Sequence, residues 1–278
     1  MQAPGSLRSG VQEIAEARDN SSGSKVACEV RGVTKSFGAV AAVDDVSVSV
    51  ERGSLTCLIG PNGAGKSTLL GCISGLLRVD TGSVVVEGQD VTRWTAHRRT
   101  EAGLGTVFQT TRPLEHLDVL GNAMVGCHPW ARAGFLEAMV RAPWQRREER
   151  RIEEEAYGAL ELVGLADRAG IDASSLPLGQ LRLLAVARAL AQRPHVLLLD
   201  EPAAGLRSAE KERLVGTLLA LKDRGLTQIL VEHDMGFVGS LAERVLVLDR
   251  GRVIADGTPA EVRENERVIE AYLGSATL

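Results

Sequence analysis

The sequence predicts an α/β protein in which buried strands alternate with helices and one helical segment interrupts the strands. Three observations support this fold class. Short, continuously apolar runs are typical of strands covered on both faces by helices. A glycine-rich loop stands between one such run and a helical pattern. The strand pattern then disappears for about eighty residues before it resumes.

The bulk properties are those of an ordinary globular protein and give no global attraction to nucleic acid. The chain has 278 residues, of which 44% are hydrophobic and 24% charged, with a net charge of −4. A basic surface is not expected, because the net charge is negative. Base-stacking aromatics are not expected either, because aromatic residues make up only 3% of the chain. The four cysteines show no metal-ligand spacing and are predicted to be small buried residues in a reducing cytosol. No run is long and apolar enough to span a bilayer, so any membrane role is expected to be peripheral.

The strands are predicted in order along the chain, after a polar, flexible tail at residues 1–24. The first two are VACEVRGV and DVSVSVE, of which the second alternates cleanly. The next are LTCLIG, GSVVVEG and LGTVFQ, and after the interruption come HVLLLD, TQILVEH and RVLVLDRGRVIADG. The domain is therefore expected to cover residues 25–278.

The interruption, at about residues 110–185, is predicted to be a helical subdomain. It includes the run WQRREERRIEEEAYGALELVGL, which favours a solvated helix face with i,i+4 ion pairs. A second helix is expected from Gln180 to Leu190, where Leu181, Leu184 and Ala187 recur at helical spacing.

A glycine-rich loop at residues 60–68 reads GPNGAGKST and matches the phosphate-binding pattern G-x-x-x-x-G-K-[ST] between a strand and a helix. Its glycines allow backbone N–H groups to surround phosphate oxygens. Lys66 is expected to reach the β- and γ-phosphates, and the Ser67 hydroxyl to bind Mg²⁺. The alternative is a glycine-rich turn without a ligand. The predicted nucleotide contacts are Gly60, Pro61, Asn62, Gly63, Ala64, Gly65, Lys66, Ser67 and Thr68.

Two adjacent acids, Asp200 and Glu201, follow the apolar strand HVLLL. An unpaired acid at the end of a buried strand is costly unless a cation accompanies it. A phosphate-binding loop also needs a carboxylate that holds Mg²⁺, so Asp200 is predicted to serve the metal. Glu201 is the candidate general base, or the group that positions the attacking water. The alternative is an acidic cap for the following helix.

Two further polar residues end predicted strands and are expected at the same edge of the sheet. His233 follows ILVE and could hydrogen-bond a γ-phosphate, although an isolated histidine is more often structural. Gln109 ends GTVFQ and could meet Mg²⁺ or the attacking water, or it could be an ordinary loop residue.

The helix that ends at Leu190 begins in an unusual way, with Pro177 and Gly179 where a serine or aspartate cap is more common. Such a start leaves backbone N–H groups uncovered at the positive end of the helix, which is a place where anions bind. The alternative is a surface helix entered through a proline turn.

Together, these motifs resemble the ATP-binding subunit of an ABC transporter from Val26 to Leu278. In the family's order come the P-loop (60–68), the Q-loop glutamine Gln109, the signature segment LPLGQ (176–180), the acid pair and the switch histidine His233. The resemblance implies an ATPase fold with a P-loop core, an antiparallel β subdomain and an inserted α-helical subdomain. It also implies that Phe37 stacks on adenine, whereas Phe37 alone suggests a core residue.

The resemblance further implies ATP and Mg²⁺ as cofactors and a second ATP-binding subunit, identical or homologous, as a partner. In such head-to-tail dimers, Leu178, Gly179 and Gln180 contact the nucleotide bound by the partner. Two integral membrane permeases and, indirectly, an external binding protein complete the expected assembly. The chain would then lie on the cytoplasmic face of the cell membrane. The segments FQTTRPLEHLDVLGNAMVG, GFLEAMVRAPWQRREERRIEEEA and VIEAYLG are similar to the LivG-like, branched-chain amino-acid import branch.

Two segments depart from the family pattern. In the signature segment, Pro177 stands where a serine is usual and Leu178 where a glycine is common. After the acid pair, Arg207 stands where an aspartate or asparagine is typical. Both concern contacts across the expected dimer.

Two other functions remain open from the sequence: an ABC ATPase that acts on DNA or ribosomes, and a nucleotide-binding regulator that does not hydrolyse ATP. A homodimer and a heterodimer are equally compatible with the sequence.

Overall fold

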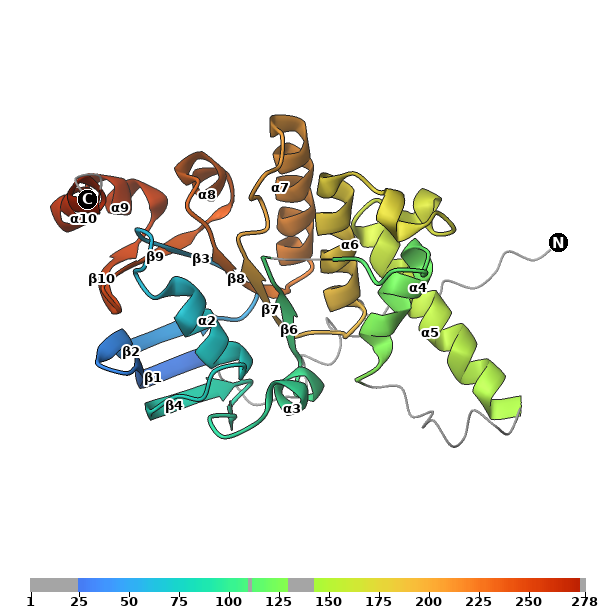
Figure 1. Cartoon of the computed structure of the whole chain (residues 1–278), viewed down its shortest axis with the longest axis horizontal. Coiled ribbons are helices and arrows are strands. Elements are labelled where there is room, and N and C mark those ends of the chain that lie inside the picture. The colour runs from blue at the N-terminus through green and yellow to red at the C-terminus, as the bar shows by residue number, and fades with distance from the viewer. Residues whose placement is uncertain (1–24, 110–111, 130–142, 276–278) are drawn as a thin grey trace. The chain divides into compact units, whose positions relative to one another are not determined.

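The computed structural model describes residues 25–109, 112–129 and 143–275. The predicted tail at residues 1–24 lies outside the described residues, as does part of the insert at 130–142. Contacts within the chain define two units (Figure 1). Of the described residues, one unit joins 25–109 to 194–275, and the other contains those between 112 and 193.

The larger unit contains a six-stranded sheet with the order β10-β9-β3-β8-β7-β6. The strands β9, β3, β8, β7 and β6 are parallel, and β10 pairs antiparallel at the edge. Every residue of β3 and β8 is buried, as the continuously apolar runs predicted. The bounds are β3 Leu55–Ile59, β6 Leu104–Val107, β7 Val196–Asp200, β8 Thr227–Val231, β9 Arg244–Asp249 and β10 Arg252–Gly257.

A second sheet in the same unit is antiparallel and has the order β2-β1-β4-β5. Its strands are β1 Val26–Phe37, β2 Val40–Glu51, β4 Thr81–Val86 and β5 Gln89–Asp90. The helices of this unit are α2 Lys66–Ser74, α3 Ala96–Glu101, α7 Ser208–Asp223, α8 Met235–Leu241, α9 Pro259–Glu264 and α10 Glu266–Ser275.

Helix α2 shares one core with both sheets of this unit. Buried Leu69 and Ile73 of α2 belong to the same apolar cluster as Val30 of β1 and Leu198 of β7. The carboxyl end of α2 is closed by Arg99 from α3, whose guanidinium donates to the carbonyls of Cys72 at 2.6 Å and Ile73 at 2.7 Å. The helix that begins in the P-loop is therefore fixed at its far end by a buried cation.

The smaller unit is helical, as the sequence predicted for its insert. Its described residues form α4 Val119–Met124, α5 Pro143–Leu162 and α6 Leu178–Leu190, which pack on one another, and three short 3₁₀ turns. The charged run forms most of α5, whose apolar side buries Ala156 and Leu160. Glu155 of this helix pairs with Arg193, which is distant along the chain, at 2.6 Å.

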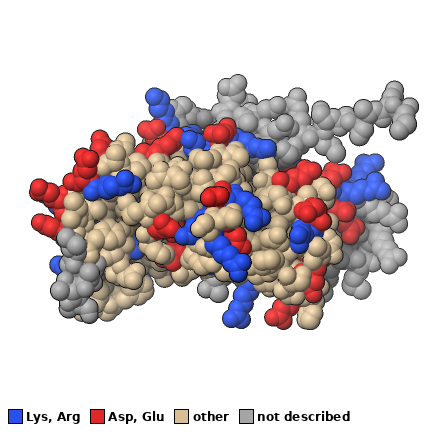
Figure 2. Space-filling view, turned by 90° about the horizontal axis from the view of Figure 1, so that it is seen from above, with Lys and Arg blue, Asp and Glu red and all other residues tan. Residues whose placement is uncertain are grey.

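The four cysteines are all buried and free, as predicted. Burial raises the pKa of the thiols of Cys28 and Cys127 to about 12 and that of Cys72 to about 11. Among the described residues, no helix is both long and apolar enough to cross a membrane. On the face shown in Figure 2, basic and acidic side chains of the described residues are interspersed, without a continuous basic area.

Candidate nucleotide-binding site

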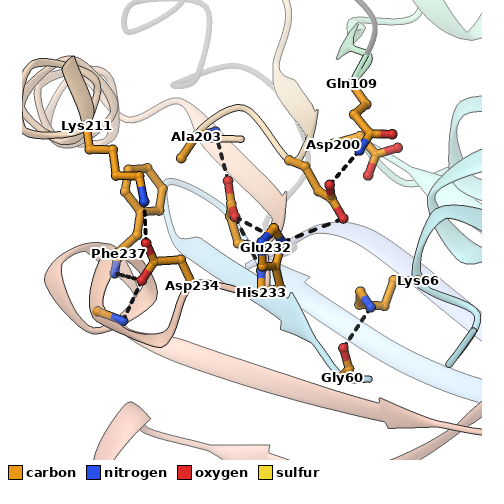
Figure 3. A network of polar contacts seen from close by, with 12 residues as sticks. Gly60, Lys66, Gln109, Asp200, Ala203, Lys211, Glu232, His233, Asp234 and Phe237 are labelled. Carbon is orange, nitrogen blue, oxygen red and sulfur yellow. Dashed lines mark hydrogen bonds and ion pairs between the residues drawn. The ribbon is translucent and has the colours of Figure 1, made fainter. Parts of the chain in front are cut away.

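The predicted site residues of the larger unit follow the carboxyl ends of four parallel strands. Gly60 follows β3, His233 comes two residues after β8, Asp200 ends β7, and Gln109 comes two residues after β6. Because these strands are hydrogen-bonded in parallel, their carboxyl ends meet at one edge of the sheet. The residues are drawn together in Figure 3.

Two glycines of the P-loop, Gly60 and Gly65, could not be replaced by another residue without a clash. Gly60 has φ +148°, and a Cβ there would lie 2.0 Å from the carbonyl oxygen of Leu248. Gly65 has φ +101°, and a Cβ there would lie 2.1 Å from the carbonyl oxygen of Ala42. Gly65 precedes α2 directly, and no described side chain caps this helix. The first N–H groups of α2 are thus left for a ligand.

Lys66 begins α2 and is almost completely buried, with 7% of its surface exposed. Its ammonium donates to the carbonyl oxygens of Gly60 at 2.7 Å and Pro61 at 2.9 Å. Burial lowers the pKa of Lys66, while the nearby carboxylates of Glu201 and Asp200 raise it. The loop therefore holds a partly desolvated cation, whose attraction for an anion is stronger than that of a solvated lysine.

Ser67 and Asp200 form the oxygen pair that the sequence predicted for a metal. The Ser67 hydroxyl lies 3.5 Å from Oδ1 of Asp200. Burial, followed by the charge of Glu201, raises the pKa of Asp200. Among the described residues, no group of three or more histidine, cysteine, aspartate or glutamate side chains could hold a metal ion. A metal at this pair would need further ligands, such as phosphate oxygens and water.

Glu201 has a left-handed backbone with φ +47°, directly after β7. Its N–H donates to the carbonyl of Val231 at 2.9 Å, which ties the turn to β8. Its side chain accepts a hydrogen bond of 2.6 Å from Nε2 of Gln109. On its other side, Nδ1 of His233 lies 3.8 Å from Oε1. The carboxylate thus lies between the two polar residues that the sequence predicted for the γ-phosphate end of the site.

Glu232 is a residue of this site that the sequence analysis did not single out. Its side chain is 1% exposed and accepts hydrogen bonds from the N–H groups of Ala203 at 2.8 Å and His233 at 3.2 Å (Figure 3). Burial raises its pKa. An acid directly after an apolar strand was the available signal, the same signal that identified Asp200.

Phe37 ends β1 and is 51% exposed, so the alternative of a core residue is wrong. The ammonium of Lys35 lies 5.6 Å from the centre of its ring. Asp80 accepts hydrogen bonds from the Lys35 ammonium at 2.8 Å and the Ser36 N–H at 2.7 Å, which fixes the strand end that carries the ring. An exposed aromatic ring on a fixed strand end can stack with a planar group.

The signature segment lies in the smaller unit, at the beginning of α6. Pro177 is the N-cap residue, and no described side chain caps the helix. Leu178 is exposed, Gly179 is buried, and Oε1 of Gln180 is buried without a hydrogen-bond partner among the described residues. Arg207, the other departure, is exposed before α7, and its N–H donates to Glu210 at 2.9 Å.

Comparisons with known proteins extend these observations over nearly the whole chain. A sequence family described as "ABC transporter" matches residues 43–204. A second, described as "Branched-chain amino acid ATP-binding cassette transporter", matches residues 252–277. The high-affinity branched-chain amino acid transport ATP-binding protein BraF of Pseudomonas aeruginosa is 37% identical, over 89% of this chain and 98% of BraF. LivG of Escherichia coli, described in the same words, is 34% identical, over 89% of this chain and 97% of LivG.

Solved structures of transporter cassettes are also similar. The ADP conformation of an ATP-binding cassette of an ABC transporter has a TM-score of 0.79 and 32% sequence identity. That alignment covers 90% of this chain and 100% of the cassette. A dimeric structure of a bacterial ABC transporter cassette has a TM-score of 0.70 and 25% identity, over 84% of this chain and 98% of that one.

Proposed function

The chain belongs to the ABC transporter family of ATPases, and from that premise we propose that it energises the import of branched-chain amino acids. The observation that carries the proposal is the cluster of Lys66, Asp200, Glu201 and His233 at one sheet edge, in a chain similar to BraF and LivG over most of its length. This fold class, ATP binding and membership of a transport family agree with the sequence analysis.

In the proposed reaction, the P-loop binds the triphosphate. Lys66 neutralises charge on the β- and γ-phosphates, and the free N–H groups at the start of α2 donate to their oxygens. The exposed ring of Phe37 stacks on adenine. These contacts supply binding and orientation, which account for much of the catalysis in phosphoryl transfer.

Mg²⁺ fits the Ser67–Asp200 pair. Mg²⁺ is commonly held by one or two protein oxygens together with phosphates and waters, and the hydroxyl and carboxylate, 3.5 Å apart, provide two such oxygens. When bound, Mg²⁺ would neutralise charge that develops on the phosphates. Asp200 must be ionised for this role, although burial raises its pKa.

Glu201 is the proposed general base for the attacking water. Gln109 and His233 lie on opposite sides of its carboxylate, at 2.6 and 3.8 Å. Gln109 would orient the water and contact Mg²⁺, while His233 would donate to the γ-phosphate. The two neighbours hold the carboxylate in place, and general-base catalysis requires a carboxylate within hydrogen-bond reach of the attacking water.

We propose that the functional unit is a head-to-tail dimer with an identical or homologous ATPase. The start of α6, with Leu178, Gly179 and Gln180, would contact the γ-phosphate bound by the partner. The absence of a described side-chain cap on α6 supports this role, because its N–H groups remain available to an anion. The dimeric structure of a related bacterial cassette also supports it.

We propose further that the loop at residues 112–118 docks on a permease at the cytoplasmic face of the membrane. This loop exposes Leu114 and Leu117, with 41% and 37% of their surfaces accessible. Fully buried Asn122 accepts from the Leu114 N–H at 2.7 Å and donates to the carbonyls of Leu117 at 3.2 Å and Asp118 at 3.0 Å. The apolar side chains are thus presented by a loop that is held from within.

The proposed function is tested by uptake of labelled leucine, isoleucine or valine in cells that depend on this chain, together with ATP hydrolysis by the purified protein. Lys66→Ala should lower ATP affinity by about tenfold to a hundredfold, because it removes a charge-assisted contact worth about 1.5–3 kcal/mol, and hydrolysis and uptake should fall with it. Unchanged Mg²⁺-dependent hydrolysis in Lys66→Ala would refute the assignment of the site. If the wild-type protein hydrolyses ATP normally but cells that lack it still take up leucine, isoleucine and valine at the normal rate, the proposed substrate class is refuted.

Docking is tested by cysteines introduced at Leu114 and Leu117, which should form cross-links to cytoplasmic loops of the co-expressed permeases. Asn122→Ala should leave ATP hydrolysis by the isolated chain unchanged while it reduces uptake, because the loop loses its internal support. Cross-links that form only from positions in the six-stranded sheet unit would contradict this docking surface.

A further inference from the structure

Glu232 connects two loops of the proposed ATPase site through one buried carboxylate. It follows β8 directly, and its own N–H donates to the carbonyl of Leu58 in β3 at 3.3 Å. Its backbone is therefore fixed to the strand that leads into the P-loop. Its side chain points back toward the loop after β7, where Oε1 accepts from Ala203 (Figure 3).

The second carboxylate oxygen faces the switch histidine. Oε2 accepts the N–H of His233 at 3.2 Å, and Nδ1 of the same histidine lies 3.9 Å away. One carboxylate thus holds the backbone of His233 and, through Ala203, the turn that contains Glu201. The Glu201 N–H also donates to the carbonyl of Val231, which joins the turn after β7 to the end of β8 a second time.

A carboxylate at this position is expensive, which indicates that it has a specific role. Burial of an acid costs free energy unless hydrogen bonds or a cation compensate for it. Two backbone donors and the nearby His233 compensate in part, whereas Glu201 opposes the charge. An apolar side chain would fill the same space at lower cost but could not accept either N–H group.

We propose that Glu232 is a positioning residue for ATP hydrolysis. It holds His233 and the turn of Glu201 in one fixed arrangement, so that the base and the γ-phosphate donor act on the same water and phosphate. This inference rests on the proposed ATPase function and adds to it a residue that does not touch the nucleotide.

Glu232→Gln tests the proposal in the purified full-length chain. The amide has nearly the same shape but replaces one acceptor oxygen with an NH₂ group, so one of the two N–H donors loses its partner. The expected result is a fall in kcat of about tenfold to a hundredfold, since small misplacements of reacting groups have effects of that size. The KM for ATP should change little, because Lys66 and α2 are untouched.

A double-mutant cycle with His233→Ala distinguishes positioning from a general structural role. If Glu232 acts through His233, Glu232→Gln should reduce kcat much less in the His233→Ala background than in the wild type. Equal effects in the two backgrounds would overturn the proposal. Glu232→Asp is a second variant, which keeps the charge but is too short to reach both amides; it should also lower kcat while leaving KM unchanged.

Gln228 provides the matched control at the other end of β8. It is fully buried, its Nε2 donates to the carbonyl of Leu218 at 2.8 Å, and its Oε1 has no hydrogen-bond partner among the described residues. Gln228→Met, which also replaces a buried polar side chain on β8, should leave kcat unchanged. A wild type that does not hydrolyse ATP would count against the proposed function. A hydrolysing wild type with an equally active Glu232→Gln variant would instead count against this inference alone.

Discussion

The helices α2 and α6 begin alike, but different groups surround their first turns. Gly65 precedes α2 and Pro177 precedes α6, and neither helix has a described side-chain cap. By contrast, α3, α4, α8 and α9 each begin with a threonine or aspartate whose side chain accepts a backbone N–H. The N-cap residue of α7, Arg207, also provides no side-chain cap, but there Glu210 of the first turn accepts the Arg207 N–H. Uncapped starts thus include the two for which the sequence predicted contact with phosphate.

The two starts differ in charge. The first turn of α2 contains Lys66, and Asp200 lies within 3.5 Å of the Ser67 hydroxyl. The first turn of α6 has no acidic residue, and its residues Leu178, Gly179 and Gln180 carry no charge. The start of α2 therefore combines amides with a cation and a nearby carboxylate, whereas the start of α6 offers amides alone. In the proposed dimer, the start of α6 would add amides to a site whose charges come from elsewhere.

The largest expected effect removes the base from the α2 side. Glu201→Gln should lower the hydrolysis rate by about 10²- to 10⁴-fold, because an amide cannot accept the proton of water. ATP binding should persist, since the amide is nearly isosteric, and the dimer should accumulate with ATP bound. Single-turnover hydrolysis and gel filtration with ATP measure the two effects. Turnover at the wild-type rate would assign the base to another residue.

The next effect distorts the P-loop itself. Gly60→Ala places a Cβ 2.0 Å from the Leu248 carbonyl, so the loop must shift and ATP affinity should fall about hundredfold. Gly63→Ala is the matched control, because a Cβ there meets no described atom within 4 Å and only the positive φ opposes it. That strain costs about 1–2 kcal/mol. Equal losses of nucleotide affinity in the two variants would contradict the packing argument.

A smaller effect is expected on the α6 side, from Pro177→Ser. Serine adds one hydroxyl that can donate to a phosphate, and one such contact is worth about 1.5–3 kcal/mol. The partner's site should then turn over about tenfold to a hundredfold faster, if the contact acts mainly in the transition state. Mixed dimers with one inactive P-loop allow each site to be measured separately.

In a heterodimer with a less altered partner, Glu201→Gln in this chain should damage transport more than the matching change in the partner. Equal damage, or no gain from Pro177→Ser, would remove the asymmetry.

The smallest effect concerns stability rather than rate. Because burial and Glu201 raise the pKa of Asp200, the folded chain holds that proton more tightly than the unfolded chain. The tighter binding of this proton stabilises the folded chain. The stabilisation is fully present below the pKa of Asp200 in the unfolded chain, and it is lost as the pH rises through the pKa in the folded chain. Asp200→Asn should therefore raise the unfolding temperature of the nucleotide-free chain at neutral pH, by about 2–4 °C per kcal/mol.

Thermal unfolding at successively lower pH provides the control for Asp200→Asn. The difference from the wild type should shrink as Asp200 becomes protonated, and Mg²⁺-dependent hydrolysis by the variant should be lost. A variant that is less stable than the wild type at neutral pH would show that the Asp200 charge is compensated in the folded chain.

Much of the α2 side could be predicted from the sequence, because its signals are local. The apolar runs of β3, β7 and β8 placed Asp200 and His233 at one edge, since parallel strands share a carboxyl end. Contacts between residues distant along the chain could not be predicted. Glu232 is one example, because its partner Ala203 lies 29 residues away. The pairing of Glu155 with Arg193, 38 residues apart, is another, whereas the sequence suggested i,i+4 pairs.

Phe37 shows a second limit. An aromatic residue at the end of a strand reads as core by hydrophobicity alone, and only the family resemblance suggested an exposed ring. Its exposure depends on how the end of β1 is held by Asp80, a residue 43 positions later that no periodicity connects to it. The same limit applies to the start of α6, because its uncapped N–H groups alone do not identify the anion that we propose for it.

The buried side chain of Asn122 holds the backbone of the loop at residues 112–118. Its contacts with Leu114, Leu117 and Asp118 all go to backbone atoms, so they do not depend on which side chains those positions carry. Substitutions of exposed side chains in such a loop usually change the free energy of unfolding by no more than about 0.5 kcal/mol. Exposed substitutions at Leu114 and Leu117 could therefore change the permease that the loop is proposed to contact, while the backbone held by Asn122 keeps its shape.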